Sequence, residues 1–162
     1  MECFHPINPI ICNRFVPHNF ERRWYAWEQK LQKRTEQEIR QKFAKEFDVD
    51  ILNDIIEELK ENKYIDDSNY IERAISEFVN LKSLSIKEIK YKLYSKGLNN
   101  NLIDDYISKN IYDLQDYEEK SAIKIINKKR SSMEDEELKM YLLKKGYREE
   151  SIKNAFNNLL DN

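Results

Sequence analysis

Residues of metal-ligand type are concentrated at the amino-terminal end of this 162-residue chain. They are Cys3, His5, Cys12 and His18, spaced C-x-H-x6-C-x5-H. Zinc knuckles usually begin with two ligands separated by two to four residues and a tight turn. The spacing here lacks that opening, which favours a peripheral arm over a zinc site. We predict no bound metal.

Paired carboxylates are the other groups that could do chemistry. They occur as Asp66-Asp67, Asp104-Asp105 and Glu149-Glu150. Adjacent side chains on a helix point roughly 100° apart, so such a pair does not share a proton. Acidic residues at helix starts, where the macrodipole favours them, explain the pairs. With no histidine after His18 to serve as a base, we predict no catalytic residue, no cofactor and no enzymatic activity.

Glycine and proline are scarce, which indicates the type of secondary structure in which the candidate residues lie. There are two glycines, and all three prolines fall in the first 17 residues. Phosphate-binding loops need clustered glycines, and short-turn β-folds need frequent glycine and proline. The sequence therefore predicts an all-α protein. A net charge of -2 predicts no global attraction to nucleic acid, but it is compatible with a local basic face.

The chain carries no signal for the membrane. No apolar run approaches the roughly 18 residues of a membrane span, and residues 1–3 lack the basic end of a signal peptide. The two cysteines define no disulfide framework. We expect a cytoplasmic protein without membrane contact, and a monomer.

A repeat of about 50 residues organises the chain after the arm. Residues 35–43 match residues 85–93, and a third copy contains Leu138 and Leu142. The first two copies begin with capping boxes, Thr35 with Glu38 and Ser85 with Glu88, whereas the third has Glu134 at the cap.

A second helix follows each of these openings. In copy two we assign it Leu102, Ile103, Ile107 and Ile111. Gly97 and Gly146 predict left-handed residues after the first helices of copies two and three. Third helices are expected to begin at Asp66-Asp67 and at Asp116, and copy three ends after two helices.

These observations predict an elongated tandem array of three three-helix repeats, the last one truncated, behind a leading helix near residues 20–31. The expected divisions are an amino-terminal arm of residues 1–19 with no assigned role, a leading helix with repeat 1 over 20–82, repeat 2 over 83–131, and repeat 3 over 132–162.

Charge alternates along the array. Residues 47–78 carry 3 basic and 10 acidic side chains, whereas residues 79–100 carry 5 and 1, and residues 120–130 carry 5 and 0. A solvated surface would explain this alternation, and so would a polar contact face for a filament or nucleic acid. The candidate contact residues are Lys87, Lys90, Lys92, Lys96, Lys124, Lys128, Lys129, Arg130, Lys144, Lys145 and Arg148.

Three segments of the repeat array have a distinctive pattern: residues 64–70 (YIDDSNY), the spacing from Ile89 through Leu93 to Lys96-Gly97-Leu98, and residues 141–147 (YLLKKGY). In this order they resemble the RecX family of recombination regulators. The likeness covers about residues 24–160. The sequence departs from the family pattern in residues 80–84, which contain no glycine, and residues 1–19 match nothing in it.

The resemblance implies a non-enzymatic modulator that binds the RecA filament on single-stranded DNA. It implies lower ATPase, strand-exchange and coprotease activity of RecA in recombination and SOS repair, and the basic face adds weak non-specific DNA binding. Two alternatives remain open from the sequence: a helix-turn-helix DNA-binding regulator, and a generic helical adaptor.

Overall fold

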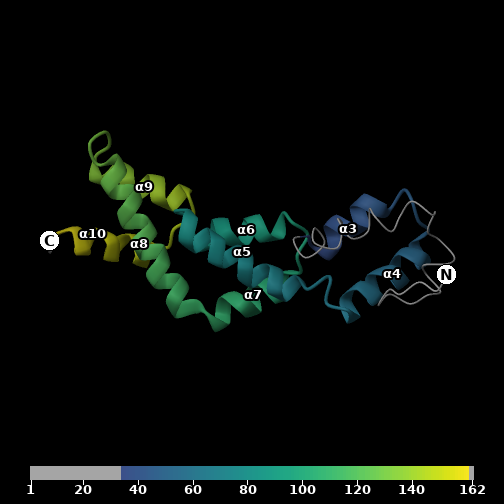
Figure 1. The fold of residues 1–162 in the computed structure, drawn as a ribbon. Helices are drawn as coiled ribbons and strands as arrows, with labels where there is room; N and C mark the ends of the chain where they lie inside the picture. The colour runs from purple at the N-terminus through teal and green to yellow at the C-terminus, as the bar shows by residue number, and fades with distance from the viewer. Residues whose placement is uncertain (1–33, 161–162) are drawn as a thin grey trace. The chain divides into compact units, whose positions relative to one another are not determined.

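The computed structural model describes residues 34–160 and is all-helical, with no strand in that range (Figure 1). Its helices, in chain order, are α3 (Glu36–Phe43), α4 (Val49–Glu61), α5 (Asp67–Leu81), α6 (Ile86–Tyr94), α7 (Asn100–Lys109), α8 (Ile111–Lys129), α9 (Asp135–Lys144) and α10 (Glu149–Leu160). The predicted all-α class is confirmed. The chain divides into two compact units, residues 1–70 and 71–162.

The described part of the first unit is built on the packing of α3 against α4. Its core consists of the buried side chains Ile39, Leu52, Ile56, Leu59 and Ile65. Spacings of three and four residues place Leu52, Ile56 and Leu59 on one face of α4, so this face is buried, whereas Asp54 and Glu57 are exposed. The ion pair between Glu36 and Lys60 of α4 links the two helices, and Glu36 also pairs with Arg40 within α3.

The second unit contains the rest of α5 and helices α6 to α10. In Figure 1, α8 lies beside α9 and α10, and it packs most extensively on α10. The carboxyl-terminal core comprises Ala122, Ile126, Leu138, Leu142, Tyr147, Ile152 and Ala155. Ile89 and Leu93 of α6 are buried, as are Ile103 and Ile107 of α7. The periodicity of these residues predicted their burial.

Both predicted capping boxes are present. In α3 the Glu38 amide donates to Thr35 Oγ1 at 3.2 Å and the Thr35 amide to Glu38 Oε2 at 3.2 Å. In α6 the corresponding bonds between Ser85 and Glu88 are 3.0 and 3.1 Å. Each box satisfies two amides that a helix start otherwise leaves without a partner. At α9, Glu134 occupies the cap without a side-chain bond, also as predicted.

The two glycines adopt the left-handed conformation that their positions predicted. Gly97 follows α6 with φ 77°, and Gly146 follows α9 with φ 84°. A residue with a Cβ is strained at such angles, so glycine is favoured where the chain turns out of a helix. These turns connect α6 to α7 and α9 to α10.

The expected start of the third helix in copy two is wrong. Helix α8 begins at Ile111, five residues before Asp116, and Ile111 is not part of α7. Asn110 serves as both the C-cap of α7 and the N-cap of α8, so one residue replaces the expected loop. Asp116 lies inside α8, where it pairs with Lys120 on an exposed face at 2.6 Å. Leu102, assigned to the apolar face of α7, is 39% exposed.

Several predictions concern residues outside the described range. These are the arm of residues 1–19, the ligand-type residues Cys3, His5, Cys12 and His18, and the leading helix near residues 20–31. Among the described helices, none is both long enough and apolar enough to cross a membrane.

Candidate interaction surface

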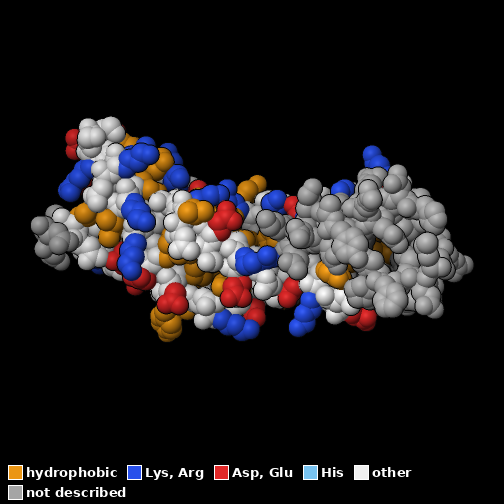
Figure 2. Space-filling model, viewed as in Figure 1, with side chains coloured by type: hydrophobic (Ala, Val, Ile, Leu, Met, Phe, Trp, Pro, Cys, Tyr) orange, Lys and Arg blue, Asp and Glu red, His pale blue; other side chains and the backbone are white. Residues whose placement is uncertain are grey.

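The basic residues singled out from the sequence all lie in the second unit. Lys87, Lys90 and Lys92 are on α6, Lys96 follows that helix, Lys124, Lys128 and Lys129 are on α8, Arg130 caps α8, Lys144 ends α9, Lys145 caps it, and Arg148 precedes α10. Figure 2 shows Lys and Arg side chains gathered over the region of α8 and α9. Eight of them are exposed, and Lys129, Lys145 and Arg148 are half-buried.

These residues differ in whether their charge is already neutralised inside the chain. Among residues 34–160, Lys87, Lys92, Lys124, Lys128 and Lys144 form no ion pair. Lys90 Nζ lies 2.5 Å from Asp104 Oδ1, and Arg130 Nε lies 3.8 Å from Asp135 Oδ1. An exposed lysine without a carboxylate neighbour keeps its full charge for a partner, so the first group carries most of the attraction for an anionic ligand.

Two half-buried lysines meet at an aromatic ring. The ammonium of Lys129, near the end of α8, lies 4.7 Å from the ring centroid of Tyr141 on α9, and the ammonium of Lys145 lies 5.8 Å from it. Cation–π contacts of this kind hold an ammonium in place without neutralising it. The side chain of Lys87 also reaches this joint, because a Cβ at Gly146 would approach its Cδ to 2.9 Å. The structure thus brings together basic residues from α6, α8 and α9.

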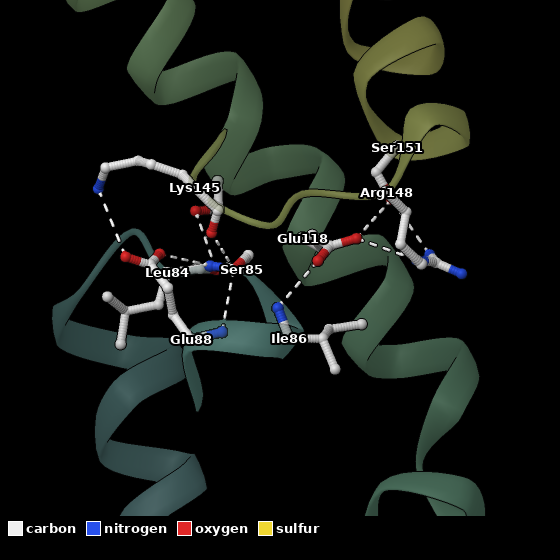
Figure 3. A network of polar contacts seen from close by, with 9 residues as sticks. Leu84, Ser85, Ile86, Glu88, Glu118, Lys145, Arg148 and Ser151 are labelled. Carbon is white, nitrogen blue, oxygen red and sulfur yellow. Dashed lines mark hydrogen bonds and ion pairs between the residues drawn. The ribbon is translucent and has the colours of Figure 1, made fainter. Parts of the chain in front are cut away.

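Arg148 belongs to a buried network instead of an open surface (Figure 3). Its Nε donates to Glu118 Oε2 at 3.0 Å, and Ser151 Oγ donates to the same oxygen at 2.7 Å. The other carboxylate oxygen of Glu118 accepts the backbone amide of Ile86, at the start of α6, at 2.9 Å. Glu118 is 0% exposed, and one side chain on α8 therefore links the start of α6 to the start of α10.

A second set of bonds fixes the same joint. Ser85 Oγ donates to the carbonyl of Lys145 at 2.7 Å, which ties the cap of α6 to the end of α9. Glu88 of the same capping box lies 3.7 Å from the ammonium of Lys145. Ser85 is 0% exposed, so the capping box is both a helix start and a contact between helices.

Buried tyrosine hydroxyls complete the network. Tyr117 Oη donates to the carbonyl of Lys82 at 2.9 Å and accepts the amide of Leu84 at 3.0 Å. The hydroxyls of Tyr147 and Ser121 lie 2.7 Å apart. Burial raises the pKa of both tyrosines above its usual value, more strongly for Tyr147. Both hydroxyls therefore stay protonated, as their hydrogen bonds require.

The paired carboxylates were expected at helix starts, which is correct for Glu149 and Glu150 in the first turn of α10 but wrong for Asp104 and Asp105, which lie in the middle of α7. Asp66 Oδ1 accepts the amide of Asn69 at 2.9 Å, and Asp67 Oδ1 accepts the amide of Glu36 at 3.1 Å. Asp104 pairs with Lys90, and Asp105 with Lys109 at 2.6 Å. Within the described residues, no group of histidine, cysteine or carboxylate side chains is arranged to hold a metal ion.

Sequence reasoning missed Glu118, the fully buried carboxylate that accepts three hydrogen bonds in this network. Its one signal was its position in α8. Glu118 lies three residues before Ser121 and four before Ala122, so it shares a helix face with two small residues and can be buried there. Sequence reasoning also left out Tyr91 and Tyr94, which are 70% and 56% exposed on α6 between the candidate lysines.

Known proteins with a similar sequence carry one description, regulatory protein RecX. The relative from Clostridium acetobutylicum is 44% identical over 77 residues, which are 47% of this chain and 35% of that protein. The relative from Clostridium tetani is 34% identical over 134 residues, 78% of this chain and 61% of that protein. The chain spans between about a third and three fifths of the length of the curated relatives it matches. No protein-family model matches the sequence.

Two solved RecX structures share the fold of this chain. The crystal structure of RecX from Lactobacillus salivarius superposes with a TM-score of 0.71 at 21% identity, over 89% of this chain and 98% of that one. A crystal structure of regulatory protein RecX gives a TM-score of 0.69 at 19% identity, over 84% and 70%. The resemblance drawn from residues 64–70, 89–98 and 141–147 is confirmed.

Proposed function

Because the chain is a member of the RecX family, we propose that it is a non-enzymatic regulator that binds the RecA filament on single-stranded DNA. It modulates RecA ATPase, strand exchange and coprotease activity in recombination and SOS repair, with inhibition as the expected direction. It acts in the cytoplasm as a monomer and binds free DNA weakly and without sequence preference.

The observation that carries the proposal is the set of unpaired lysines in the second unit. Lys124 and Lys128 lie one turn apart on α8, and Lys144 ends α9, which packs against α8. All three are exposed. A nucleoprotein filament presents DNA phosphates and acidic protein groups, to which such lysines are complementary.

The proposed organisation of the chain suits this role. We retain the divisions 20–82, 83–131 and 132–162, to which the described helices contribute α3 to α5, α6 to α8, and α9 with α10. In repeat proteins, stacked helical units offer surfaces that can contact several neighbouring protomers of a filament.

The test is a RecA ATPase titration on single-stranded DNA. We expect stoichiometric protein to lower ATP hydrolysis by RecA. For the triple variant Lys124→Glu, Lys128→Glu, Lys144→Glu we expect the concentration that gives the same inhibition to be at least about tenfold higher. Lys153→Glu is the matched control, because Lys153 is an exposed, unpaired lysine on α10 outside the candidate set. Absence of both inhibition and filament binding by the unmodified protein would refute the proposal.

A further inference from the structure

The outward face of α6 combines two exposed tyrosines with three lysines. Residues 87, 91 and 94 follow each other at spacings of four and three, so Lys87, Tyr91 and Tyr94 form one line along the helix. Lys90 lies about 60° to one side of this line, whereas Lys92, next to Tyr91 in the sequence, points about 100° away from Tyr91 on the other side. All five side chains are exposed. We call these five residues the tyrosine–lysine face.

The fold fixes which way this face points. Ile89 and Leu93 occupy the opposite side of α6 and are 0% and 1% exposed. The capping box, together with the hydrogen bond from the Ile86 backbone amide to Glu118, holds the start of the helix in place. Figure 2 shows hydrophobic, basic and acidic side chains interspersed around α6. The face is therefore a firmly held surface.

The two rings are not explained by packing. Tyr91 is 70% exposed and Tyr94 is 56% exposed, although both are large aromatic side chains. Residues three apart on a helix are neighbours, about 5–6 Å between Cβ atoms, so the rings lie within reach of the same ligand. Neither hydroxyl forms a hydrogen bond within residues 34–160.

The charges beside the rings select the ligand. Lys87 and Lys92 form no ion pair with any described residue, whereas Lys90 shares its charge with Asp104. A ligand for this face must offer anionic groups to the lysines and flat rings to the tyrosines. Single-stranded nucleic acid alternates phosphates with unstacked bases and meets both needs. A duplex hides its base faces inside the stack, and an acidic protein surface offers carboxylates without a regular series of flat rings between them.

From this we propose that the tyrosine–lysine face binds single-stranded nucleic acid, with bases stacked on Tyr91 and Tyr94 and phosphates held by Lys87, Lys90 and Lys92. This inference does not rest on the proposed action on RecA, because the face is complete within the second unit. Binding at this face differs from non-specific charge attraction because it requires the bases of the strand as well as its phosphates.

The test compares three fluorescently labelled probes by anisotropy at low salt, with no RecA present. They are a 20-nucleotide oligothymidine, an abasic phosphodiester strand of equal length and charge, and a duplex. We expect the full-length protein to bind oligothymidine at least about fivefold more tightly than the abasic strand, since each stacked base is worth at least that factor. An oligouridine of the same length determines whether RNA or DNA is preferred, and tighter binding than to the abasic strand by either one supports the site.

Variants separate stacking from charge. Tyr91→Ala with Tyr94→Ala is expected to weaken oligothymidine binding about tenfold or more and to leave abasic binding unchanged. Lys87→Gln with Lys92→Gln is expected to weaken both and to flatten the salt dependence. Tyr112→Ala is the control, because Tyr112 is 83% exposed on α8 but lies beside Asp113. All variants are expected to keep the helical circular dichroism of the unmodified protein.

Either of two results would overturn the inference. One is that neither oligothymidine nor oligouridine binds the unmodified protein more tightly than the abasic strand does, including no binding of any strand. The other is a folded tyrosine variant that binds oligothymidine as well as the unmodified protein does.

Discussion

The starts of α3 and α6 are built alike but supported differently. Both have a capping box, and in both the first helical amide is bonded by a carboxylate more than 30 residues further along the chain. At α3 that amide belongs to Glu36 and the acceptor is Asp67, at 3.1 Å. At α6 it belongs to Ile86 and the acceptor is Glu118, at 2.9 Å.

The difference lies in what surrounds the distant carboxylate. Glu118 is fully buried and accepts two further hydrogen bonds, from Arg148 and Ser151. Asp67 is half-buried, and burial raises its pKa. The hydrogen bond from the Glu36 amide opposes this rise, and the negative charge of the Glu36 carboxylate adds to it. One hydrogen bond to a helix start can therefore be a minor cap or the centre of a network. The outcome depends on whether the accepting carboxylate also has a cation and further donors beside it, as Glu118 has in Arg148 and Ser151.

Removal of the two carboxylates is expected to show the largest contrast. Glu118→Ala leaves Arg148, Ser151 and the Ile86 amide without their acceptor, and should lower the free energy of unfolding by about 3–5 kcal/mol. Asp67→Ala removes one bond from a half-buried acceptor and should cost about 0.5–2 kcal/mol. Urea unfolding of both variants measures the difference, and equal losses would show that the network adds nothing to the cap.

Packing at the two helix starts is expected to be equal, which isolates the polar difference. Ile39 and Ile89 occupy the same position, four residues after the cap, and are 1% and 0% exposed. Ile39→Ala and Ile89→Ala should each cost about 2–5 kcal/mol, as should Leu142→Ala in the core of α9. An unchanged melting temperature for any of the three would contradict the burial of that site.

The two glycine turns sharpen the comparison within the second unit. Alanine at Gly97 or Gly146 must adopt a positive φ, at a cost of about 1–2 kcal/mol. At Gly146 the added Cβ would also lie 2.9–3.3 Å from the side chain of Lys87. Gly146→Ala should therefore lower the melting temperature more than Gly97→Ala, and the reverse order would show that Lys87 moves aside freely.

The sequence allowed the helices, both capping boxes and both glycine turns to be predicted, because these depend on residues within one turn of each other. It did not allow Glu118 to be identified, because burial of a carboxylate depends on Arg148 and Ser151 arriving from another helix. The start of α8 was misplaced for a related reason. Asp116 has the side chain of a cap, but Asn110 had already ended one helix and begun the next.

That dependence on distant partners also determined what could be said of the basic residues. Their types and spacing marked all eleven as candidates, and the sequence could not separate Lys124 and Lys128, which form no ion pair with described residues, from Arg148, which holds a buried carboxylate. The separation matters for experiments, because mutation of Arg148 tests the fold whereas mutation of Lys124 tests binding.

The pH dependence of Asp67 is the smallest expected effect and has a definite sign. Because its pKa is higher in the folded state, the folded protein holds more protons than the unfolded chain as pH rises from the usual value of 3.8 to the raised one. The contribution of Asp67 to stability is therefore greatest below 3.8 and declines through that window. Glu36 acts oppositely: burial alone would raise its pKa, but Lys60 and Arg40 lower it, so its contribution is lost as pH falls.

Asp67→Asn separates the two groups, because the asparagine oxygen can still accept the Glu36 amide without a buried charge. At pH 7 we expect this variant to be as stable as the unmodified protein or more stable by less than about 1 kcal/mol. Below the window, where Asp67 is protonated in both states, that advantage should vanish. Thermal unfolding of both proteins between pH 3 and 7 measures the difference, and an advantage that grew as pH fell would mean that the Asp67 carboxylate is stabilised, not strained, by its burial against Glu36.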